Sequence, residues 1–376
     1  MAKAKYVRGS DGFFQARVWD GTYNPDGSKH RKTIRSSKSS ADLERKVNAL
    51  RQAVSEGKSV QKTGSYFVDY CRIWLKTYKG IREDNTIAMY DNVIEKHIAP
   101  TLDGVKLQDI RRTHFQLVIN AAADKPRTCQ QIALTFRQVI KSAMRDKYLP
   151  GTAYEDICED IDVPKYAAKE KRALYPEEIA AIKKADFSPM QRCFVYIIYG
   201  CGLRRGEVLG LNKNLHVDLK HGVLKVNTSI RFLKNDPGHK DPKSHNGFRQ
   251  VPMPEFLTAF LKEYIPTLDG VSDYLIHKQD GSMMTKSAYD NMWASIVEKM
   301  NAAAGGTDNL KVIYGFTAHT FRHNYCTSLC YQVPAISIKK IAQLMGDSEM
   351  VVLKVYNHVK EERENVEKVI NNAVAM

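Results

Sequence analysis

Two arginines in the C-terminal half of the sequence have neighbours at helical spacing that would orient a guanidinium group. Arg204, in the motif GCGLRRGE, precedes Glu207 by three residues, and on a helix running through Leu211 the two side chains would share one face. Arg322, in AHTFRH, follows His319 by three residues, so that both donors would point at one position. Taken alone, the first motif is explained more simply as a structural ion pair, because a half-buried arginine needs a partner.

A zinc site is an alternative explanation for the second motif. On a helix, one stripe would carry His319, His323, Cys326 and Cys330, bordered by Arg322. One straight helix cannot place four ligands tetrahedrally around an ion, and we identify no second segment that would complete the site. A core histidine and buried thiols explain His323 and the two cysteines better. His319 and Arg322 then remain as a donor pair, and we expect no metal.

A lysine and a tyrosine complete the set of candidate residues. Lys243, in KDPKSHNGFRQVPM, stands just before the polar turn of a hairpin predicted over residues 240–253, and Lys240 lies close to it. Tyr356 ends the segment LMGDSEMVVLKVY, nine residues after Asp347. When it is considered alone, a tyrosine in such an apolar stretch is more often part of the core than catalytic.

The elements that must position these residues form the last of three predicted domains. Residues 173–376 begin with a helix whose first turn has proline and acidic side chains, pass through a strand-rich section at about 222–253, and are helical to the end. Residues 61–160 are predicted to be helical, with segments around 65–79, 85–98, 113–122 and 128–147. Residues 161–172 form a predicted linker. The predicted fold class is therefore mainly α with small β-sheets (α+β).

The first domain, residues 1–60, is predicted to contain a small sheet and a helix. Alternating patterns at 12–20 and 29–35 flank a turn-rich stretch, and helical spacing runs from Ser39 to about Glu56. If the strands pair antiparallel, the helix would cover one face of the sheet. The other face would be exposed and would carry Arg17, Trp19, Arg31, Thr33 and Arg35. A solvated hairpin without a binding role is equally consistent with this pattern.

Charge indicates the class of partner. The chain has 376 residues and a formal net charge of +15, to which residues 1–60 contribute +7, 61–150 contribute +6, 151–165 contribute −4 and 166–376 contribute +6. Positive charge spread over several domains favours nucleic acid, although a basic protein without such a partner has the same composition. The longest apolar stretch, 193–203, is too short to cross a bilayer. With seven cysteines and no export segment, we expect a cytoplasmic protein with reduced thiols and no membrane partner.

In their order and spacing, the motifs GCGLRRGE, the hairpin lysine, HTFRH, LMGDS and the tyrosine resemble the tyrosine recombinase (phage integrase) family. The resemblance covers the whole C-terminal domain. The segment NTIAMYDNVIEKHIAPTLDGVKLQDI is similar to the helical, SAM-like core-binding domain of this family. Residues 1–60 are similar to the arm-binding domain of integrases from conjugative transposons and some phages. The resemblance implies a site-specific recombinase, an integrase, that inserts and excises a bacterial mobile element.

The resemblance also implies a transesterification on double-stranded DNA that needs neither metal nor cofactor. Tyr356 would attack a phosphodiester to form a 3′-phosphotyrosine, while Arg204 and Arg322 would bind the non-bridging oxygens. His319 would help to take the tyrosine proton, and Lys243 would protonate the leaving 5′-oxygen. The residues that we expect to contact DNA outside the catalytic pocket are Arg17, Trp19, Arg31, Arg35, Thr86 and Lys141.

Asp347 departs from the family pattern, which has histidine or sometimes tryptophan at this position. A carboxylate beside a phosphate is unfavourable unless it is protonated or turned onto an arginine. This departure is the only support for the alternative function, a catalytically impaired DNA-binding regulator on the same fold. The other motif residues are all retained and argue for an active enzyme with Arg204, Lys243, His319, Arg322, Asp347 and Tyr356 in its active site.

The expected partners follow from the same resemblance. They are attachment sites with core and arm repeats, three further copies of the chain in a tetramer that resolves a Holliday junction, and an excisionase or a host DNA-bending protein. The tail after Tyr356 has apolar residues at helical spacing, namely Val366, Val369, Ile370 and Val374. We expect this tail to dock on a neighbouring protomer, with packing on its own domain as the alternative.

Overall fold

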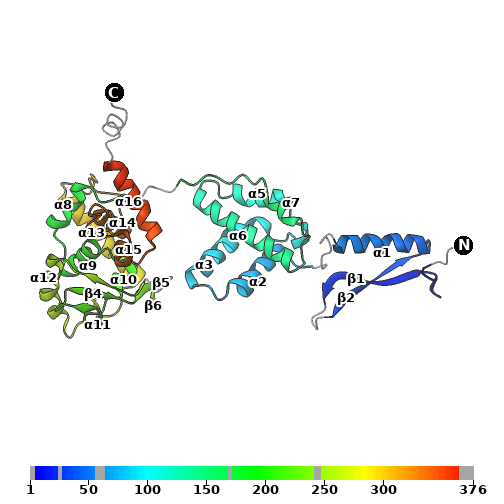
Figure 1. The fold of residues 1–376 in the computed structure, drawn as a ribbon, viewed down its shortest axis with the longest axis horizontal. Coiled ribbons are helices and arrows are strands. Elements are labelled where there is room, and N and C mark those ends of the chain that lie inside the picture. The colour runs from blue at the N-terminus through cyan, green and yellow to red at the C-terminus, as the bar shows by residue number, and fades with distance from the viewer. Residues whose placement is uncertain (1–4, 24–27, 56–63, 168–171, 241–246, 364–376) are drawn as a thin grey trace, which may run out of the picture. The chain divides into compact units, whose positions relative to one another are not determined.

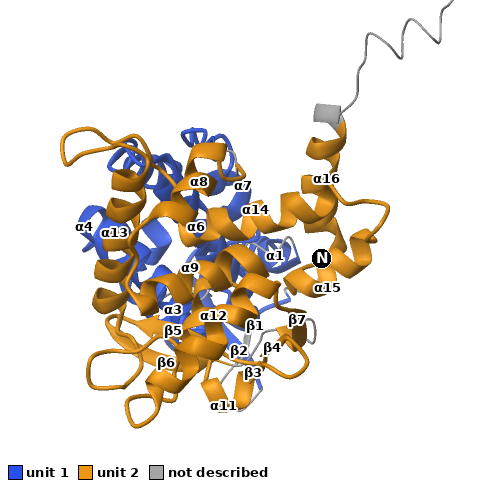
Figure 2. Ribbon diagram, turned by 90° about the vertical axis from the view of Figure 1, so that its left-hand side faces the viewer, with its two compact units in different colours: residues 1–168 blue, residues 169–376 orange. Residues whose placement is uncertain are grey.

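The computed structural model describes residues 5–23, 28–55, 64–167, 172–240 and 247–363, and it divides into two compact units, 1–168 and 169–376 (Figure 1, Figure 2). Lys243 and the tail from Glu364 onward lie outside the described residues. The division falls inside the predicted linker. The predicted fold class, mainly α with small sheets, is confirmed.

The N-terminal part of the first unit is a two-stranded antiparallel sheet with one helix. β1 (Phe14–Tyr23) pairs with β2 (Lys29–Ser36), and α1 (Ser40–Ser55) follows. Val18 of β1 packs with Leu43 and Val47 of α1, so the helix covers one face of the sheet as predicted. The register places Arg17 opposite Thr33 and Trp19 opposite Arg31. These residues and the exposed Arg35 therefore lie on the uncovered face.

A second hydrophobic core holds the helices of residues 67–158. They are α2 (Phe67–Lys79), α3 (Asp84–Val93), a π-helical turn (Ile94–Ile98), α4 (Ala99–Leu102), a 3₁₀ turn (Leu107–Asp109), α5 (Arg112–Asn120), α6 (Pro126–Arg145) and α7 (Ala153–Cys158). Their centre is aromatic: Phe115 and Phe136 stack with ring centroids 4.1 Å apart, and Phe67 packs on Phe136 at 5.0 Å. Each of the four predicted helical segments is present within two residues at its start, because its apolar spacing matches the buried face.

The start of the predicted linker is attached to this helical core. Gln116 of α5 hydrogen-bonds the backbone of Asp162 in both directions, at 2.9 and 3.0 Å, and Ile161 and Val163 pack against the core. At the other end, Arg172 belongs to the second unit, where both oxygens of Glu178 accept from its guanidinium at 2.7 Å. The two ends of the linker thus belong to different units.

The second unit begins with α8 (Pro176–Lys184), α9 (Pro189–Cys201), α10 (Arg205–Leu209) and α11 (Lys213–His216). Its strands are β3 (Val217–Asp218), β4 (Val223–Val226), β5 (Ser229–Leu233), β6 (Asp236–Lys240) and β7 (Arg249–Pro252). The chain continues through α12 (Glu255–Tyr264), a 3₁₀ turn (Ile265–Leu268), α13 (Lys286–Ala303), α14 (Ala318–Cys330), α15 (Ile338–Met345) and α16 (Glu349–Arg363). Most of these elements share one core, whereas α14, α15 and α16 enclose a smaller one. No helix within the described ranges combines the length and apolarity that a membrane span needs.

The described residues do not show the predicted hairpin over residues 240–253, whose turn at 241–246 lies outside them. β6 and β7, which flank it, belong to different antiparallel sheets: β6 pairs with β5, and β7 pairs with β4 in the order β3-β4-β7. The β5–β6 hairpin is closed by a tight turn at Lys234, whose φ of 56° is left-handed. β7 joins β4 instead because Val251 and Leu224, which face each other in the register, are both fully buried.

Candidate active site

Arg204 sits at the beginning of a helix rather than within one. α9 ends at Cys201 and is capped by Gly202, whose φ is +61°. A Cβ on Gly202 would lie 2.3 Å from the ring of Tyr325, so only glycine fits there. The predicted helix through Leu211 is therefore interrupted, and Arg204 becomes the N-cap of α10. The predicted partner is correct: Glu207 accepts from the Arg204 backbone N–H at 2.8 Å and from Arg204 Nη1 at 3.0 Å.

Arg322 is a buried charge with several acceptors. It projects from α14, is 1 % exposed, and donates through Nη1 to the carbonyl of Gly202 at 2.8 Å. Its Nη2 donates to the carbonyl of Met345 and, at 2.6 Å, to Oδ2 of Asp347. Burial and the nearby Arg204 lower the pKa of Arg322, whereas Asp347 and Glu207 raise it. The two carbonyls and the carboxylate thus stabilise a guanidinium that burial alone would disfavour.

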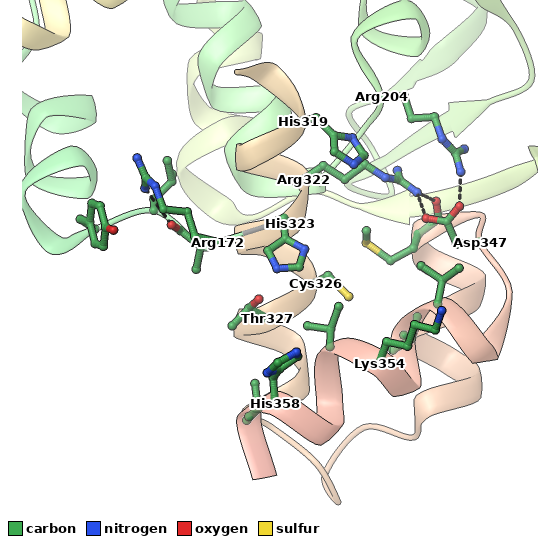
Figure 3. Close-up of a pocket in the computed structure, with 18 residues that line it drawn as sticks. Arg172, Arg204, His319, Arg322, His323, Cys326, Thr327, Asp347, Lys354 and His358 are labelled. Carbon is green, nitrogen blue, oxygen red and sulfur yellow. Dashed lines mark hydrogen bonds and ion pairs between the residues drawn. The ribbon is translucent and has the colours of Figure 1, made fainter. Parts of the chain in front are cut away.

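The LMGDS motif forms the turn that holds both arginines. Gly346 ends α15 with a left-handed φ of 61°, which points the backbone back toward the pocket. Its carbonyl accepts from Arg204 Nη2 at 3.0 Å. Asp347 then ion-pairs with both arginines, with Oδ1 on Arg204 and Oδ2 on Arg322 (Figure 3). Burial raises the pKa of Asp347, but Arg322 and Arg204 outweigh it, and the net shift is downward.

Of the two orientations that the sequence allows for Asp347, the structure has the one turned onto the arginines. Each carboxylate oxygen of Asp347 accepts from one guanidinium group, so the side chain neutralises part of the charge of Arg204 and Arg322 and fixes their relative position. Asp347 therefore belongs to one connected group of charges, Arg204, Glu207, Arg322 and Asp347, which we call the arginine cluster.

Arg249 was missed as a site residue by the sequence analysis. Its side chain, 5 % exposed, places Nη1 and Nη2 on the two oxygens of Glu207 at 3.0 and 2.7 Å. Its Nε donates to the carbonyl of Leu344 at 2.8 Å. A signal was present: Arg249 is two residues from the buried Val251 on the same strand, so it faces the same side and needs a partner there.

A pocket of about 820 Å³ opens beside these groups, and all the residues that line it belong to the second unit. His319, Arg322, Arg204 and Asp347 lie together in it, and His323, Cys326, Lys354 and His358 line it further along α14 and α16 (Figure 3). Cys326 and Cys330 are buried, as expected. His319 is exposed, and His323, which was expected in the core, is only half-buried and lines the pocket. Among the described side chains, no group of three or more His, Cys, Asp or Glu is arranged to hold a metal ion.

Tyr356 is not among the residues that line this pocket. It lies on α16, between Lys354 and His358, which do line it. Its ring is half-buried and packs against the small core that includes Cys326, Ile341 and Val352. The structure therefore brings together four of the six predicted catalytic residues, Arg204, His319, Arg322 and Asp347. It places Tyr356 on the adjacent helix face.

The predicted DNA-contacting residues lie at the surface of the first unit. Arg17, Arg31 and Arg35 are exposed, and Lys29 Nζ lies 4.9 Å from the ring centroid of the half-buried Trp19. Thr86 is half-buried in the first turn of α3, which begins at Asp84, one residue before the predicted segment 85–98. Lys141 is exposed on α6, and its Nζ lies 4.4 Å from the ring centroid of Tyr154. These positions leave each cationic side chain at the surface.

Comparison with known proteins identifies the family of the chain. Residues 172–363 match the phage integrase family, and residues 66–122 match the N-terminal SAM-like domain of phage integrases. Tyrosine recombinase XerD of Pseudomonas aeruginosa is 26 % identical over 308 residues, which cover 77 % of this chain and 91 % of that protein. The transposase from transposon Tn916 of Enterococcus faecalis is 28 % identical over 218 residues, which cover 54 % and 50 %.

Solved structures show the same fold. The integrase of transposon Tn1549 in complex with a circular intermediate DNA superposes with a TM-score of 0.64 at 18 % identity, covering 79 % of this chain and 99 % of that one. A lambda integrase tetramer bound to a Holliday junction superposes with a TM-score of 0.56 at 14 % identity, covering 93 % of each chain. The family match spans more than half of the 376 residues and includes every residue of the arginine cluster. The chain therefore belongs to the phage integrase family, the tyrosine recombinases that cleave and rejoin DNA at specific sites.

Proposed function

We propose that the chain is the integrase of a mobile element, and that the arginine cluster around Asp347 is its active site. The observation that carries this proposal is the meeting of Arg204 and Arg322 at one pocket. One backbone carbonyl holds Arg204, two hold Arg322, and the carboxylate of Asp347 is shared by both. Two rigid, preorganised guanidinium groups suit the two non-bridging oxygens of a phosphodiester and the charge that grows there in the transition state.

The reaction would be an in-line exchange of one ester for another. Tyr356 Oη attacks the scissile phosphorus, the bond from phosphorus to the 5′-oxygen breaks, and a 3′-phosphotyrosine and a free 5′-hydroxyl result. His319 accepts the phenolic proton, because a phenol of pKa about 10 is a weak nucleophile unaided. Lys243 gives a proton to the leaving oxygen. The reverse attack by a 5′-hydroxyl of the other strand rejoins the DNA.

This reaction requires Tyr356 to move toward the arginines. In the structure its ring is half-buried against the core of α14, α15 and α16, while Lys354 and His358 of the same helix line the pocket. We propose that DNA binding turns or shifts α16, which exchanges the burial of Tyr356 for a position beside the scissile phosphate. Such a change would couple cleavage to assembly on DNA.

The remaining DNA contacts would come from the first unit. The uncovered face of the β1–β2 sheet has Arg17, Trp19, Arg31 and Arg35 and would bind arm-type sites. Thr86 and Lys141 would contact the core-type site next to the point of cleavage. We propose four protomers on a Holliday junction, as in the lambda integrase tetramer, together with an excisionase or a host DNA-bending protein. No observation favours the alternative of an impaired regulator.

A nicked suicide substrate tests the proposal. Wild-type protein should form a covalent adduct that survives a denaturing gel, and Tyr356→Phe should form none while it still binds the site, because only the attacking oxygen is removed. Tyr331→Phe is the matched control, since Tyr331 packs against the same small core and should keep the adduct. EDTA should leave the wild-type yield unchanged. An adduct in Tyr356→Phe would show that another nucleophile acts.

A further inference from the structure

Arg249 connects the two structures that hold the catalytic arginines, although it touches neither arginine itself. Its guanidinium takes both oxygens of Glu207, at 3.0 and 2.7 Å, and the carbonyl of Leu344, at 2.8 Å. Both oxygens of Glu207 also accept from Arg204. Leu344 directly precedes Met345 and Gly346, whose carbonyls accept from Arg322 and Arg204. Arg249 is not among the residues that line the pocket.

We propose that Arg249 is a positioning residue for strand cleavage, which holds Glu207 and the end of α15 so that Arg204 and Arg322 face the phosphate. The inference rests on the proposed function, because its effect is exerted at that same site.

Burial explains why Glu207 needs Arg249. The carboxylate is 5 % exposed, so desolvation raises its pKa, and the ion pair with Arg249 is the largest influence that lowers it again. Without Arg249, the Glu207 carboxylate would lose the two hydrogen bonds that fix its position, and the two bonds that it accepts from Arg204 would no longer be held in one direction. Arg204 would be most affected because its side chain is 40 % exposed and depends on these anchors for its direction.

The second connection acts on Arg322. The carbonyl of Leu344 fixes the last turn of α15 against β7, and the left-handed Gly346 follows two residues later. If this anchor is lost, the carbonyl of Met345 and the carboxylate of Asp347 lose their fixed position relative to Arg322. The planar guanidinium of Arg249 binds the Glu207 carboxylate with two nitrogens and the Leu344 carbonyl with the third. The ammonium group of a lysine cannot make the same three contacts.

The test compares Arg249→Met and Arg249→Lys with the control Lys213→Met. Lys213 is a similarly buried cation in the same unit, with 8 % exposure and an ion pair to Asp269, and it does not line the pocket. Melting temperature, affinity for a core site and the single-turnover rate of cleavage are measured for the full chain on DNA. Removing a direct oxyanion donor lowers the rate of an enzyme by a factor of about 10²–10³. Arg249 only supports such donors, so we expect Arg249→Met to lower the cleavage rate about tenfold or more. Affinity in Arg249→Met should change less than about threefold, because phosphate contacts made elsewhere are intact.

A substrate with a methylphosphonate at the scissile position separates positioning from folding. Its methyl group replaces one charged oxygen, so cleavage needs less help from the two arginines. The rate ratio of wild type to Arg249→Met should therefore shrink on this substrate, and Arg249→Lys should recover part of the loss on the normal one. An unchanged ratio, or an equal slowing in Lys213→Met, would overturn the proposal. The adduct assay with Tyr356→Phe reports on the proposed function separately, and an Arg249→Met protein that cleaves at the wild-type rate refutes only the role of Arg249.

Discussion

Replacing Asp347 tests whether its carboxylate helps or opposes the reaction. In Asp347→Asn the shape is nearly kept, but the ion pairs with Arg204 and Arg322 are lost. A charge-assisted hydrogen bond contributes about 1.5–3 kcal/mol, and breaking a fully buried pair costs about 3–5 kcal/mol. Asp347 is 24 % exposed and Arg322 keeps two carbonyl acceptors, so we expect the lower end, about 2 kcal/mol of unfolding free energy. For a unit of this size that corresponds to a drop in melting temperature of about 4–8 °C.

The effect on cleavage follows from the same geometry. With Asp347 absent, Arg204 retains Glu207 and one carbonyl, and its guanidinium is free to take other directions. Loss of about 1.4 kcal/mol of transition-state stabilisation is tenfold in rate, so we expect Asp347→Asn to cleave at least about tenfold more slowly. DNA affinity should not fall, because the local charge becomes more positive by one. The cleavage rate of Asp347→Glu, which keeps the charge, should lie between the rates of wild type and Asp347→Asn.

Asp347→His is the most informative variant, because histidine is the residue that the family pattern has here. From the sequence alone, a carboxylate facing the phosphate predicts that the histidine variant cleaves at least as fast as the parent. The structure predicts the opposite, since an imidazole cannot accept from both arginines at once. Single-turnover rates at saturating DNA, measured for all four proteins, distinguish these outcomes. If the asparagine and histidine variants cleave as fast as wild type, Asp347 does not position the arginines.

Three further predictions concern pH and the two ends of the chain. Because the folded-state pKa of Asp347 is lowered, its stabilisation is present above the unfolded value of about 3.9 and is lost as pH falls through the folded value. The difference in melting temperature between wild type and Asp347→Asn should therefore be constant from pH 8 to about pH 5 and shrink below about pH 4; a difference that grows on acidification would contradict this. Removing residues 1–60 should weaken footprints on arm sites and spare cleavage at a core site, since the basic face of the β1–β2 sheet is lost. Each lost phosphate contact should lower the slope of log affinity against log salt concentration by about 0.9. Unchanged footprints on arm sites would refute the proposed role of this face in DNA binding. Truncation before Glu364 should disturb tetramer assembly on DNA more than binding to a single site, as measured by gel shift; equal loss of both with a lower melting temperature would indicate packing on the same protomer.

The fold was predictable where periodicity and burial coincide. The helices of residues 67–145 have apolar residues every three or four positions, and these residues form the buried core around Phe67, Phe115 and Phe136. The residues that share the uncovered face of the β1–β2 sheet were predictable, because the two strands alternate between apolar and polar side chains. The pairing of β6 and β7 was not predictable from the sequence. Nothing local distinguishes a pairing of these two strands with each other from the pairing of β7 with the more distant β4. That choice depends on Val251 and Leu224 meeting in the core, a contact between distant segments.

Four of the predicted site residues, Arg204, His319, Arg322 and Asp347, meet at one pocket, but the way in which they are held there was not predictable. Helical spacing suggested that Arg204 and Glu207 interact through a continuous helix, whereas Gly202 ends one helix and Arg204 begins the next. The contact survives because an N-cap residue and the third residue of the helix are also neighbours. Alternation on its strand indicates that Arg249 needs a partner in the interior, but not which one, since its partners lie 42 and 95 residues away in the chain. Only accounting for each buried charge identifies Glu207 as the partner.

The same accounting explains how a tyrosine recombinase can have a carboxylate at position 347. Together with Arg249, the arginine cluster has three guanidinium groups, on Arg204, Arg249 and Arg322, and two carboxylates, on Glu207 and Asp347, so the net charge is +1. A scissile phosphodiester has one negative charge and would bring the cluster to neutrality. With a neutral histidine in place of Asp347 the net charge would be +2, which favours the phosphate more strongly but leaves the DNA-free protein with a larger uncompensated charge around the buried Arg322. Asp347 therefore shifts part of the compensation from the substrate to the protein. Without DNA, the wild-type protein should therefore have a higher melting temperature than Asp347→His, and its arginines should be better ordered.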